Sequence, residues 1–257
     1  MIETVDQTAW GVFAKRIRAG WSRDRSSNKG FQLTAEDIEI VTSKTCRIPI
    51  TGVTGAGKST FLYLLATLKW PRAGEICWRF PDGKRFIWGK KGKGLSAEEL
   101  YVLRGQYFGF AFQNSTLLPH LTVRENLSYP LWQRGLSTRL ARKITDEKLG
   151  KVRVESDPKL AEFLGRFPSQ LSGGQRQRAA LAQAWIHDPY VLFADEPTGN
   201  LDSQTRREVM KVIDNWLNEQ PGKRLFIWVT HHDEDKIRHG VAAHIEVRNG
   251  AVEWKSA

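Results

Sequence analysis

The sequence predicts an α/β fold: a mostly parallel sheet flanked by helices, with a helical subdomain inserted into it. Three continuous apolar runs, at residues 47–50, 190–194 and 225–229, predict strands buried on both faces, as in a parallel sheet covered by helices. Apolar residues at helical spacing across 209–217 predict an amphipathic helix between the last two strands. Residues 115–170, punctuated by prolines, differ in character and predict a separate, mostly helical lobe.

Each predicted strand leads into residues that could carry chemistry. The first leads into a glycine-rich loop, the second into Asp195 and Glu196, and the third into Thr230 and His231. Because ligands of open parallel sheets bind beyond the carboxyl ends of the strands, we expect these residues to share one edge. Pro49 lacks a ladder donor and predicts a local irregularity in the first strand.

Three other segments are assigned by composition. Residues 61–69 predict a buried helix after the loop, and residues 84–94, rich in lysine, arginine and glycine, predict a solvated hairpin or loop. In the N-terminal basic segment, residues 1–30, Trp10 and Trp21 belong to an apolar set near helical spacing among basic residues. This pattern fits an amphipathic helix on anionic lipid, or equally a terminal element packed on the sheet domain.

The composition is that of a soluble protein with surplus positive charge. Of the 257 residues 40% are hydrophobic, and no apolar run approaches the ~18 residues of a membrane span, so we expect no bilayer crossing. The start, residues 1–7, lacks the pattern of a secretory signal, and the two cysteines are not spaced as metal ligands, which favours the cytoplasm. The net charge of +11 favours a polyanion: nucleotide, nucleic acid or anionic lipid.

The glycine-rich loop matches the eight-residue phosphate-binding pattern between a strand and a helix. Its residues are Gly52, Val53, Thr54, Gly55, Ala56, Gly57, Lys58 and Ser59. Backbone N–H groups and a helix N-terminus would bind phosphate oxygens, which makes a plain glycine turn the weaker interpretation. Lys58 would reach the β- and γ-phosphates of a nucleotide, and Ser59 would bind Mg²⁺.

The acidic pair after the second strand complements this loop. Asp195 would hold Mg²⁺ beside the phosphates, and Glu196, one residue on, would orient and deprotonate an attacking water. Isolated Asp-Glu pairs are often capping or surface acids, but five preceding apolar residues make that interpretation poor here.

A second helix N-terminus follows the lobe. Ser172, Gly173, Gly174 and Gln175 have the form of a capping box before a run of good helix formers. Taken alone this segment favours a plain capped helix. It is also a second anion site, and one nucleotide cannot easily fill both.

The phosphate loop, Leu171–Gln175 and the run Asp195–Asp202 together resemble the ATPase subunit of an ABC transporter over nearly the whole chain. The resemblance implies a P-loop NTPase core in which two subunits face head to tail and enclose two ATP molecules. Each ATP would lie between one phosphate loop and the partner's Ser172–Gln175 signature, with Asp202 at the dimer seam. The anticipated cofactors are ATP and Mg²⁺.

The same resemblance implies further roles. The catalytic set would be Lys58, Glu196, His231 as a γ-phosphate sensor, and Gln113, which would link Mg²⁺ and water to a transmembrane partner. The metal set would be Ser59, Gln113 and Asp195, and Thr60 would contact the α-phosphate. The adenine-stacking aromatic departs from the family pattern: Trp21 and Phe31 are the candidates, of which Trp21 is favoured. His232, where many relatives have an acid, is a smaller departure.

The domain organisation follows from these motifs. We expect the N-terminal basic segment at 1–30, the ATP-binding core at 31–113 and 175–257, and the helical subdomain at 114–174, ending with the signature. Within the family, residues 110–127 and 195–202 look most like the lipoprotein-release, macrolide-export and cell-division branch. The resemblance implies a separate transmembrane permease-type subunit, a second ATPase subunit that forms a homodimer with this one, and a peripheral position on the cytoplasmic membrane face.

The sequence raises two rival functions. An ABC-type ATPase acting on DNA or the ribosome would suit the +11 charge, yet the sequence shows neither a heptad insertion nor an internal repeat, so no nucleic acid is expected. An ATP-gated regulator without meaningful turnover is disfavoured by the complete set of catalytic residues. Both rivals share the nucleotide site.

Overall fold

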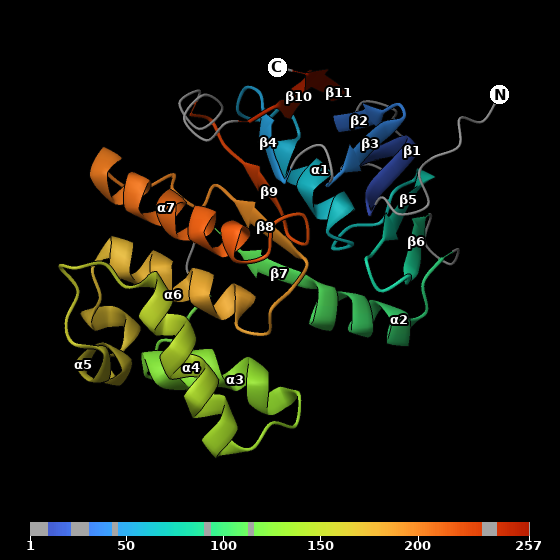
Figure 1. Ribbon diagram of the computed structural model, residues 1–257. Coiled ribbons are helices and arrows are strands. Elements are labelled where there is room, and N and C mark those ends of the chain that lie inside the picture. Colours follow the sequence, from blue (N-terminus) through green and yellow to red (C-terminus); the bar gives the residue numbers. More distant parts are fainter. Residues whose placement is uncertain are drawn as a thin grey trace.

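The computed structural model describes residues 10–21, 31–42, 46–89, 94–112, 116–232 and 241–256, and of Trp21 the backbone only. These residues form an 11-stranded sheet flanked by helices, with a helical lobe to one side (Figure 1). The strand order is β6 (Arg85–Gly89), β5 (Ala73–Arg79), β1 (Gly11–Trp21), β2 (Phe31–Ala35), β11 (Ala251–Ser256), β10 (Ala243–Arg248), β4 (Arg47–Thr51), β9 (Leu225–Val229), β8 (Val191–Asp195), β7 (Phe108–Ala111), and β3 (Ile38–Val41) pairs with β1.

The parallel half of the sheet contains the three predicted strands, which are neighbours in the order β4, β9, β8. β7 and β10 extend this half in parallel on either side. The irregularity expected at Pro49 is small: its register with β9 is regular, opposite Trp228, and the pairing of β4 with β10 begins only at Ile50. The α/β prediction is confirmed. Outside this half β11 pairs with β2 in parallel, and the other strand pairs of the sheet are antiparallel.

The apolar runs are continuous because both sheet faces are covered. In β8, Val191 and Phe193 join a hydrophobic cluster that includes α1, whereas Leu192 and Ala194 join one that includes α6 and α7. A fully buried side chain of this size contributes about 1.5–3 kcal/mol relative to exposure. The helices are α1 (Lys58–Leu65), α2 (Ala97–Val102), the π-helix η1 (Leu103–Tyr107), α3 (Val123–Gln133), α4 (Thr138–Val152), α5 (Leu160–Gly165), the 3₁₀ turn η2 (Pro168–Gln170), α6 (Gly173–Trp185) and α7 (Ser203–Glu219).

Of the two interpretations of the N-terminal apolar set, the amphipathic helix is wrong and a terminal element packed in the sheet domain is supported, because Gly11–Trp21 form β1 between β5 and β2. Trp10 and Ile17 are buried, so these side chains are in the core and do not face a membrane surface. Buried side chains alternate at Val12 and Ala14 and again at Ile17 and Ala19. The extra residue between these two pairs lies at a β-bulge, where the register with β5 shifts between Lys15 and Arg18 and Arg16 has a φ of 46°. The bulge breaks the period of two from which a strand is predicted.

The basic segment 84–94 is a hairpin only in part. Its residues Arg85–Gly89 are β6, which pairs antiparallel with β5 after a tight turn. Phe86 and Trp88 are buried in the core cluster, so the solvated interpretation is wrong for this strand. The high lysine, arginine and glycine content of residues 84–94 favoured a loop, although Arg85–Gly89 form a strand with Phe86 and Trp88 on its buried face.

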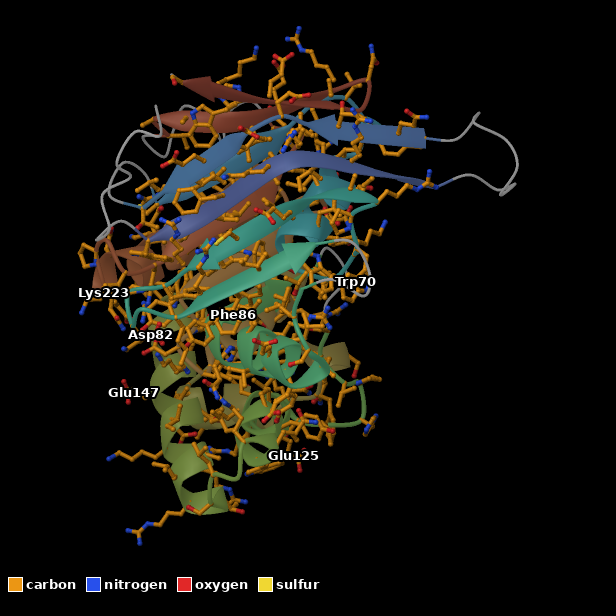
Figure 2. All side chains as sticks on the ribbon, turned by 90° about the vertical axis from the view of Figure 1, so that its right-hand side faces the viewer. Trp70, Asp82, Phe86, Glu125, Glu147 and Lys223 are labelled. Atoms are coloured by element: carbon orange, nitrogen blue, oxygen red, sulfur yellow. The ribbon has the colours of Figure 1, made fainter. Side chains whose placement is uncertain are left out.

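The helical lobe is confirmed in the residues that the structure describes. α3, α4 and α5 pack together and against α6, which joins the lobe to the sheet domain. Viewed from the side, the lobe projects below the sheet, with Glu125 and Glu147 on it and Trp70 and Phe86 on the sheet domain (Figure 2). Over the described ranges, no helix has both the length and the apolar character to span a membrane.

Candidate nucleotide-binding site

The phosphate-loop sequence connects β4 to α1 at the carboxyl end of the parallel strands. Gly57 precedes α1 with a φ of 110° and makes no side-chain cap, so the first-turn N–H groups stay open to a ligand. Gly52 has a φ of 138°, and a Cβ there would lie 2.1 Å from the Val247 carbonyl oxygen. Both positions require glycine.

Lys58 begins α1 and is almost fully buried. Its ammonium donates to the carbonyl oxygens of Gly52 at 3.0 Å and Val53 at 3.1 Å. An ammonium has three donors, so one remains for an anion in the loop. The loop therefore holds its cation by its own backbone.

A cavity of about 450 Å³ lies over this loop. Its lining residues are Phe31, Thr54, Gly55, Gly57, Lys58, Ser59, Thr60 and Glu196. The Phe31 ring is close to the backbone, since a Cβ on Gly57 would lie 2.5 Å from Phe31 Cζ. The structure therefore brings Phe31 of β2 to the cavity. Trp21 ends β1 opposite Phe31, and its side chain lies outside what the structure describes.

The carboxylate of Asp195 lies beside the first turn of α1. Ser59 Oγ donates to Asp195 Oδ1 at 2.9 Å, and Tyr63 Oη donates to Oδ2 at 2.6 Å. Burial and the Asp195 carboxylate raise the pKa of Tyr63 well above its usual range, so the phenol stays protonated and donates. A hydroxyl and a carboxylate oxygen form a hard donor set that fits Mg²⁺.

Tyr63 was not predicted from the sequence. It lies on α1 one turn after Ser59, a spacing that places two side chains on one helix face. Its ring also contacts Phe112, at 6.4 Å between centroids. Gln113, which follows Phe112, lies outside the described residues, so its predicted role is untested.

Glu196 follows β8 in a left-handed backbone conformation, with a φ of 47°. Such a conformation costs about 1–3 kcal/mol for a residue other than glycine and occurs often at functional sites. The carboxylate lines the loop cavity, and Glu196 Oε2 is 3.7 Å from His231 Nδ1. The predicted meeting of the strand ends is confirmed for this pair.

The third strand end lies on the other side of the loop. His231 and His232 line a cavity of about 650 Å³ that also includes Gly52, Val53 and Arg248. The two imidazole rings are 4.0 Å apart between centroids, and the His231 side chain is 42% exposed. His231 is therefore accessible from solvent while it faces Glu196.

The signature segment begins α6 as the capping box predicts. Ser172 Oγ accepts from the Gln175 N–H at 3.2 Å, and Gln175 Oε1 accepts from the Ser172 N–H at 3.1 Å. Ser172 and Gly173 are exposed, and Gly173 lines a separate cavity of about 740 Å³ together with Glu196 and Asn200. The signature residues do not line the cavity over the phosphate loop of their own chain.

Asp202 caps α7 on an exposed surface. Its carboxylate accepts from the Thr205 hydroxyl at 2.6 Å and from the N–H groups of Thr205 and Gln204. These hydrogen bonds, led by that from the Thr205 side chain, hold the pKa of Asp202 below its usual value. The carboxylate stays ionised at the start of a helix, where a negative charge is favourable.

Comparison with known proteins supports one family. Residues 36–199 match the family model described as ABC transporter. The chain is 37% identical over 206 residues to the lipoprotein-releasing system ATP-binding protein LolD of Aquifex aeolicus, covering 80% of this chain and 81% of LolD. It is 37% identical over 211 residues to the macrolide export ATP-binding/permease protein MacB of Syntrophobacter fumaroxidans, covering 81% of this chain but only 27% of that protein's length.

Solved structures agree. The dimeric structure of MJ0796, a bacterial ABC transporter cassette, matches with a TM-score of 0.74 and 30% identity, covering 96% of this chain and 98% of that one. A dimeric post-hydrolysis state of the same cassette, bound to ADP and Pi, matches with a TM-score of 0.74 and 29% identity over the same shares of the two chains.

Proposed function

This chain belongs to the ABC transporter family as an ATP-binding and ATP-hydrolysing subunit, and from that premise we propose that two copies enclose two ATP molecules and drive a separate membrane protein. One observation carries the proposal: two helix N-termini of the chain, at Gly57 and at Ser172–Gly173, open on different cavities, and both are suited to anions. A single nucleotide cannot occupy both, whereas a head-to-tail pair would bring each loop opposite a signature segment. The MJ0796 cassette is dimeric.

Within one subunit we assign the phosphate chemistry to the residues around the loop. Lys58 and the first-turn N–H groups of α1 would neutralise charge on the β- and γ-phosphates, and Thr60 would contact the α-phosphate. Mg²⁺ would supply further positive charge when bound. Its proposed ligands are Ser59, Asp195 and Gln113.

Glu196 is assigned to the attacking water. Glu196 lines the loop cavity and also the cavity that includes Gly173, so it would lie between the nucleotide and the dimer seam. From there it would accept the proton of the water that attacks the γ-phosphate. His231, 3.7 Å away, would orient Glu196 and sense the γ-phosphate.

The adenine base is assigned to Phe31 in preference to Trp21. Phe31 lines the loop cavity with its ring close to Gly57, which supports it as the aromatic side chain beside the phosphate loop. Base–aromatic contacts are worth about 1–3 kcal/mol. Trp21 remains the alternative.

The membrane partner is assigned by family. LolD belongs to a lipoprotein-releasing system and MacB to macrolide export, so we propose a permease-type partner and a peripheral position on the cytoplasmic face of a membrane. The chain spans about a quarter of the length of MacB, whose title includes a permease. Anionic lipid contact through Trp10 and Ile17 is not proposed, because these side chains are buried.

The Glu196→Gln variant tests the function. A glutamine cannot accept the water's proton, so ATP hydrolysis should fall about 10²–10⁴-fold while the affinity for ATP stays within about twofold. With hydrolysis blocked, light scattering after gel filtration should show dimers with Mg-ATP and monomers without it. Glu147→Gln, at an exposed acid of α4, is the matched control and should behave as the parent does. A Glu196→Gln protein that stays monomeric in ATP would refute the composite site.

A further inference from the structure

A buried charge pair joins the signature helix α6 to the segment that follows α4. Arg178 of α6 and Asp157, in the segment after α4, are joined through Nη2 and Oδ1 at 2.7 Å, and their side chains are 3% and 1% exposed. The desolvation penalty of such a pair can exceed its Coulomb gain, so a buried ion pair is a poor source of net stability. A role in fixing geometry is therefore the better hypothesis for it.

The Asp157 carboxylate also reaches the signature itself. Its Oδ1 accepts from Gln175 Nε2 at 3.2 Å, and its Oδ2 accepts from the Val154 N–H at 2.9 Å. Because Asp157 holds Nε2 of Gln175, Oε1 of the same amide points to the Ser172 N–H. That N–H donates a hydrogen bond to Oε1 at 3.1 Å. Asp157 thus fixes the orientation of the amide that completes the capping box.

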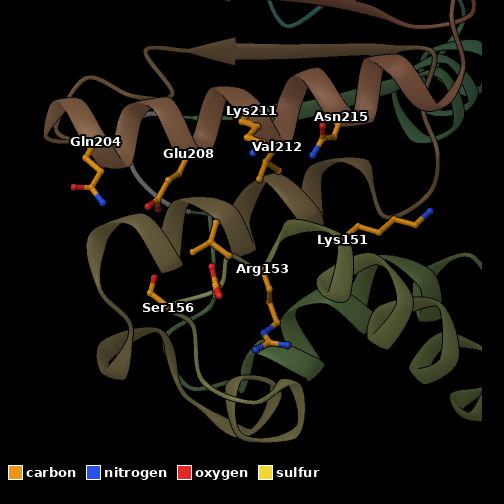
Figure 3. A pocket seen from close by; sticks show the side chains of 10 residues that line it. Lys151, Arg153, Ser156, Gln204, Glu208, Lys211, Val212 and Asn215 are labelled. Carbon is orange, nitrogen blue, oxygen red and sulfur yellow. The ribbon is translucent and has the colours of Figure 1, made fainter.

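Arg178 carries the connection to α7. Its Nη1 is 3.0 Å from Glu208 Oε2, so one guanidinium joins the lobe segment, α6 and α7. Glu208 extends from α7 into a groove of about 740 Å³, whose opposite side carries Arg153 and Ser156 (Figure 3). Of the three charged residues, Glu208 lines this groove, and the Arg178–Asp157 pair is buried beside it.

The N-termini of α6 and α7 are also in direct contact. A Cβ on Gly174 would lie 2.4 Å from Thr205 Cγ2, so only glycine allows this approach. The same Thr205 donates its hydroxyl to Asp202 at 2.6 Å. Thr205 therefore contacts both Gly174 of the signature and Asp202, the residue expected at the dimer seam.

We propose that Asp157 is a positioning residue for the partner's ATP site: with Arg178 and Glu208 it locks the signature N-terminus to the seam helix α7. The inference rests on the proposed function, because the signature acts across the dimer. It places a residue outside the motifs in control of the surface presented to the second subunit. Loss of Asp157 should therefore weaken ATP-driven dimerisation without changing how a monomer binds ATP.

The test uses Asp157→Asn in the Glu196→Gln protein. Asparagine keeps the shape but leaves the Arg178 charge with Glu208 alone, so we expect the ATP-bound dimer to dissociate about tenfold more readily. Sedimentation velocity would measure dimer affinity, and a fluorescent ATP analogue at monomer concentrations should give a nucleotide affinity within about twofold of the parent. Asp146→Asn is the matched control: that acid pairs with Arg124 on the exposed side of α4 and has no link to the signature.

The outcomes separate the inference from the proposed function. Unchanged dimerisation of a folded Asp157→Asn protein, or an equal loss of monomer ATP binding, would overturn the positioning role. If the parent itself does not dimerise, the proposed function fails, and hydrogen exchange at the Gln175 and Arg176 amides of the monomer decides the inference. Faster exchange in Asp157→Asn than in Asp146→Asn supports it, and equal exchange refutes it.

A milder variant covers a loss of folding. Glu208→Gln removes the second, 30% exposed carboxylate of Arg178 and leaves the buried pair intact. It should weaken the dimer by a smaller factor than Asp157→Asn, again with unchanged monomer ATP affinity. A Glu208→Gln dimer as tight as the parent's would contradict the connection to α7.

Discussion

The N-termini of α1 and α6 are both suited to anions, yet they are built in opposite ways. α1 follows Gly57 with no side-chain cap, and its open N–H groups face a cavity walled by Lys58 and Phe31. α6 is capped reciprocally by Ser172 and Gln175, and its first residues are exposed. The first site takes its cation and its open N–H groups from its own chain, whereas the second is a preformed surface that needs a ligand held elsewhere.

Three substitutions compare the N-termini of α1 and α6. Of these, the removal of the Lys58 charge at α1 should have the largest effect on ATP affinity. Lys58→Ala removes the charge-assisted contact with phosphate oxygens, and ATP affinity should fall about hundredfold. Titration calorimetry would measure it. Lys143→Ala, at an exposed position of α4, controls for the loss of one positive charge. Wild-type affinity in Lys58→Ala would mean that the loop does not hold the phosphates.

Removing the aromatic wall should have a smaller effect, limited to the base. Phe31→Ala should weaken ATP binding about tenfold, within the range of base–aromatic stacking, and leave the affinity for tripolyphosphate unchanged. Competition with a fluorescent nucleotide would measure both ligands. Trp21→Ala is the paired variant: if it, and not Phe31→Ala, selectively weakens ATP binding, Trp21 is the stacking residue.

Removing the cap of the second site should have the smallest effect on the monomer. Ser172→Ala should lower the free energy of unfolding by about 1 kcal/mol, as loss of an N-cap does, and leave monomer ATP affinity unchanged. Ser96→Ala removes the same kind of capping box from α2, away from the seam, and should cost about the same. Only Ser172→Ala should also weaken the ATP-bound dimer. Equal dimerisation of the two variants, measured by sedimentation, would show that the cap serves α6 alone.

Local patterns predicted much of this molecule. The strands β4, β8 and β9 were found because a strand covered on both faces must be apolar throughout. The box at Ser172 was found because capping depends on residues three positions apart. Both signals lie within a few residues of the chain, where sequence distance and spatial distance agree.

Other features depend on partners remote in sequence. The strand β1 was not predicted, because its period of two is broken by the bulge near Arg16, which forms against β5 where Gly74 lets the Arg16 carbonyl oxygen approach. Tyr63 Oη lies 2.6 Å from Asp195 Oδ2, although the two residues are 132 positions apart in the chain. No local pattern identifies such a contact.

The sequence by itself determined the phosphate loop, the acidic pair, the signature cap and the family to which they belong, because each depends on residue types at short fixed spacing. Only the tertiary structure decided that Phe31 borders the loop, that Tyr63 holds Asp195, and that Asp157 joins the signature to α7. These contacts depend on how strands and helices pack, and packing is set by the whole core.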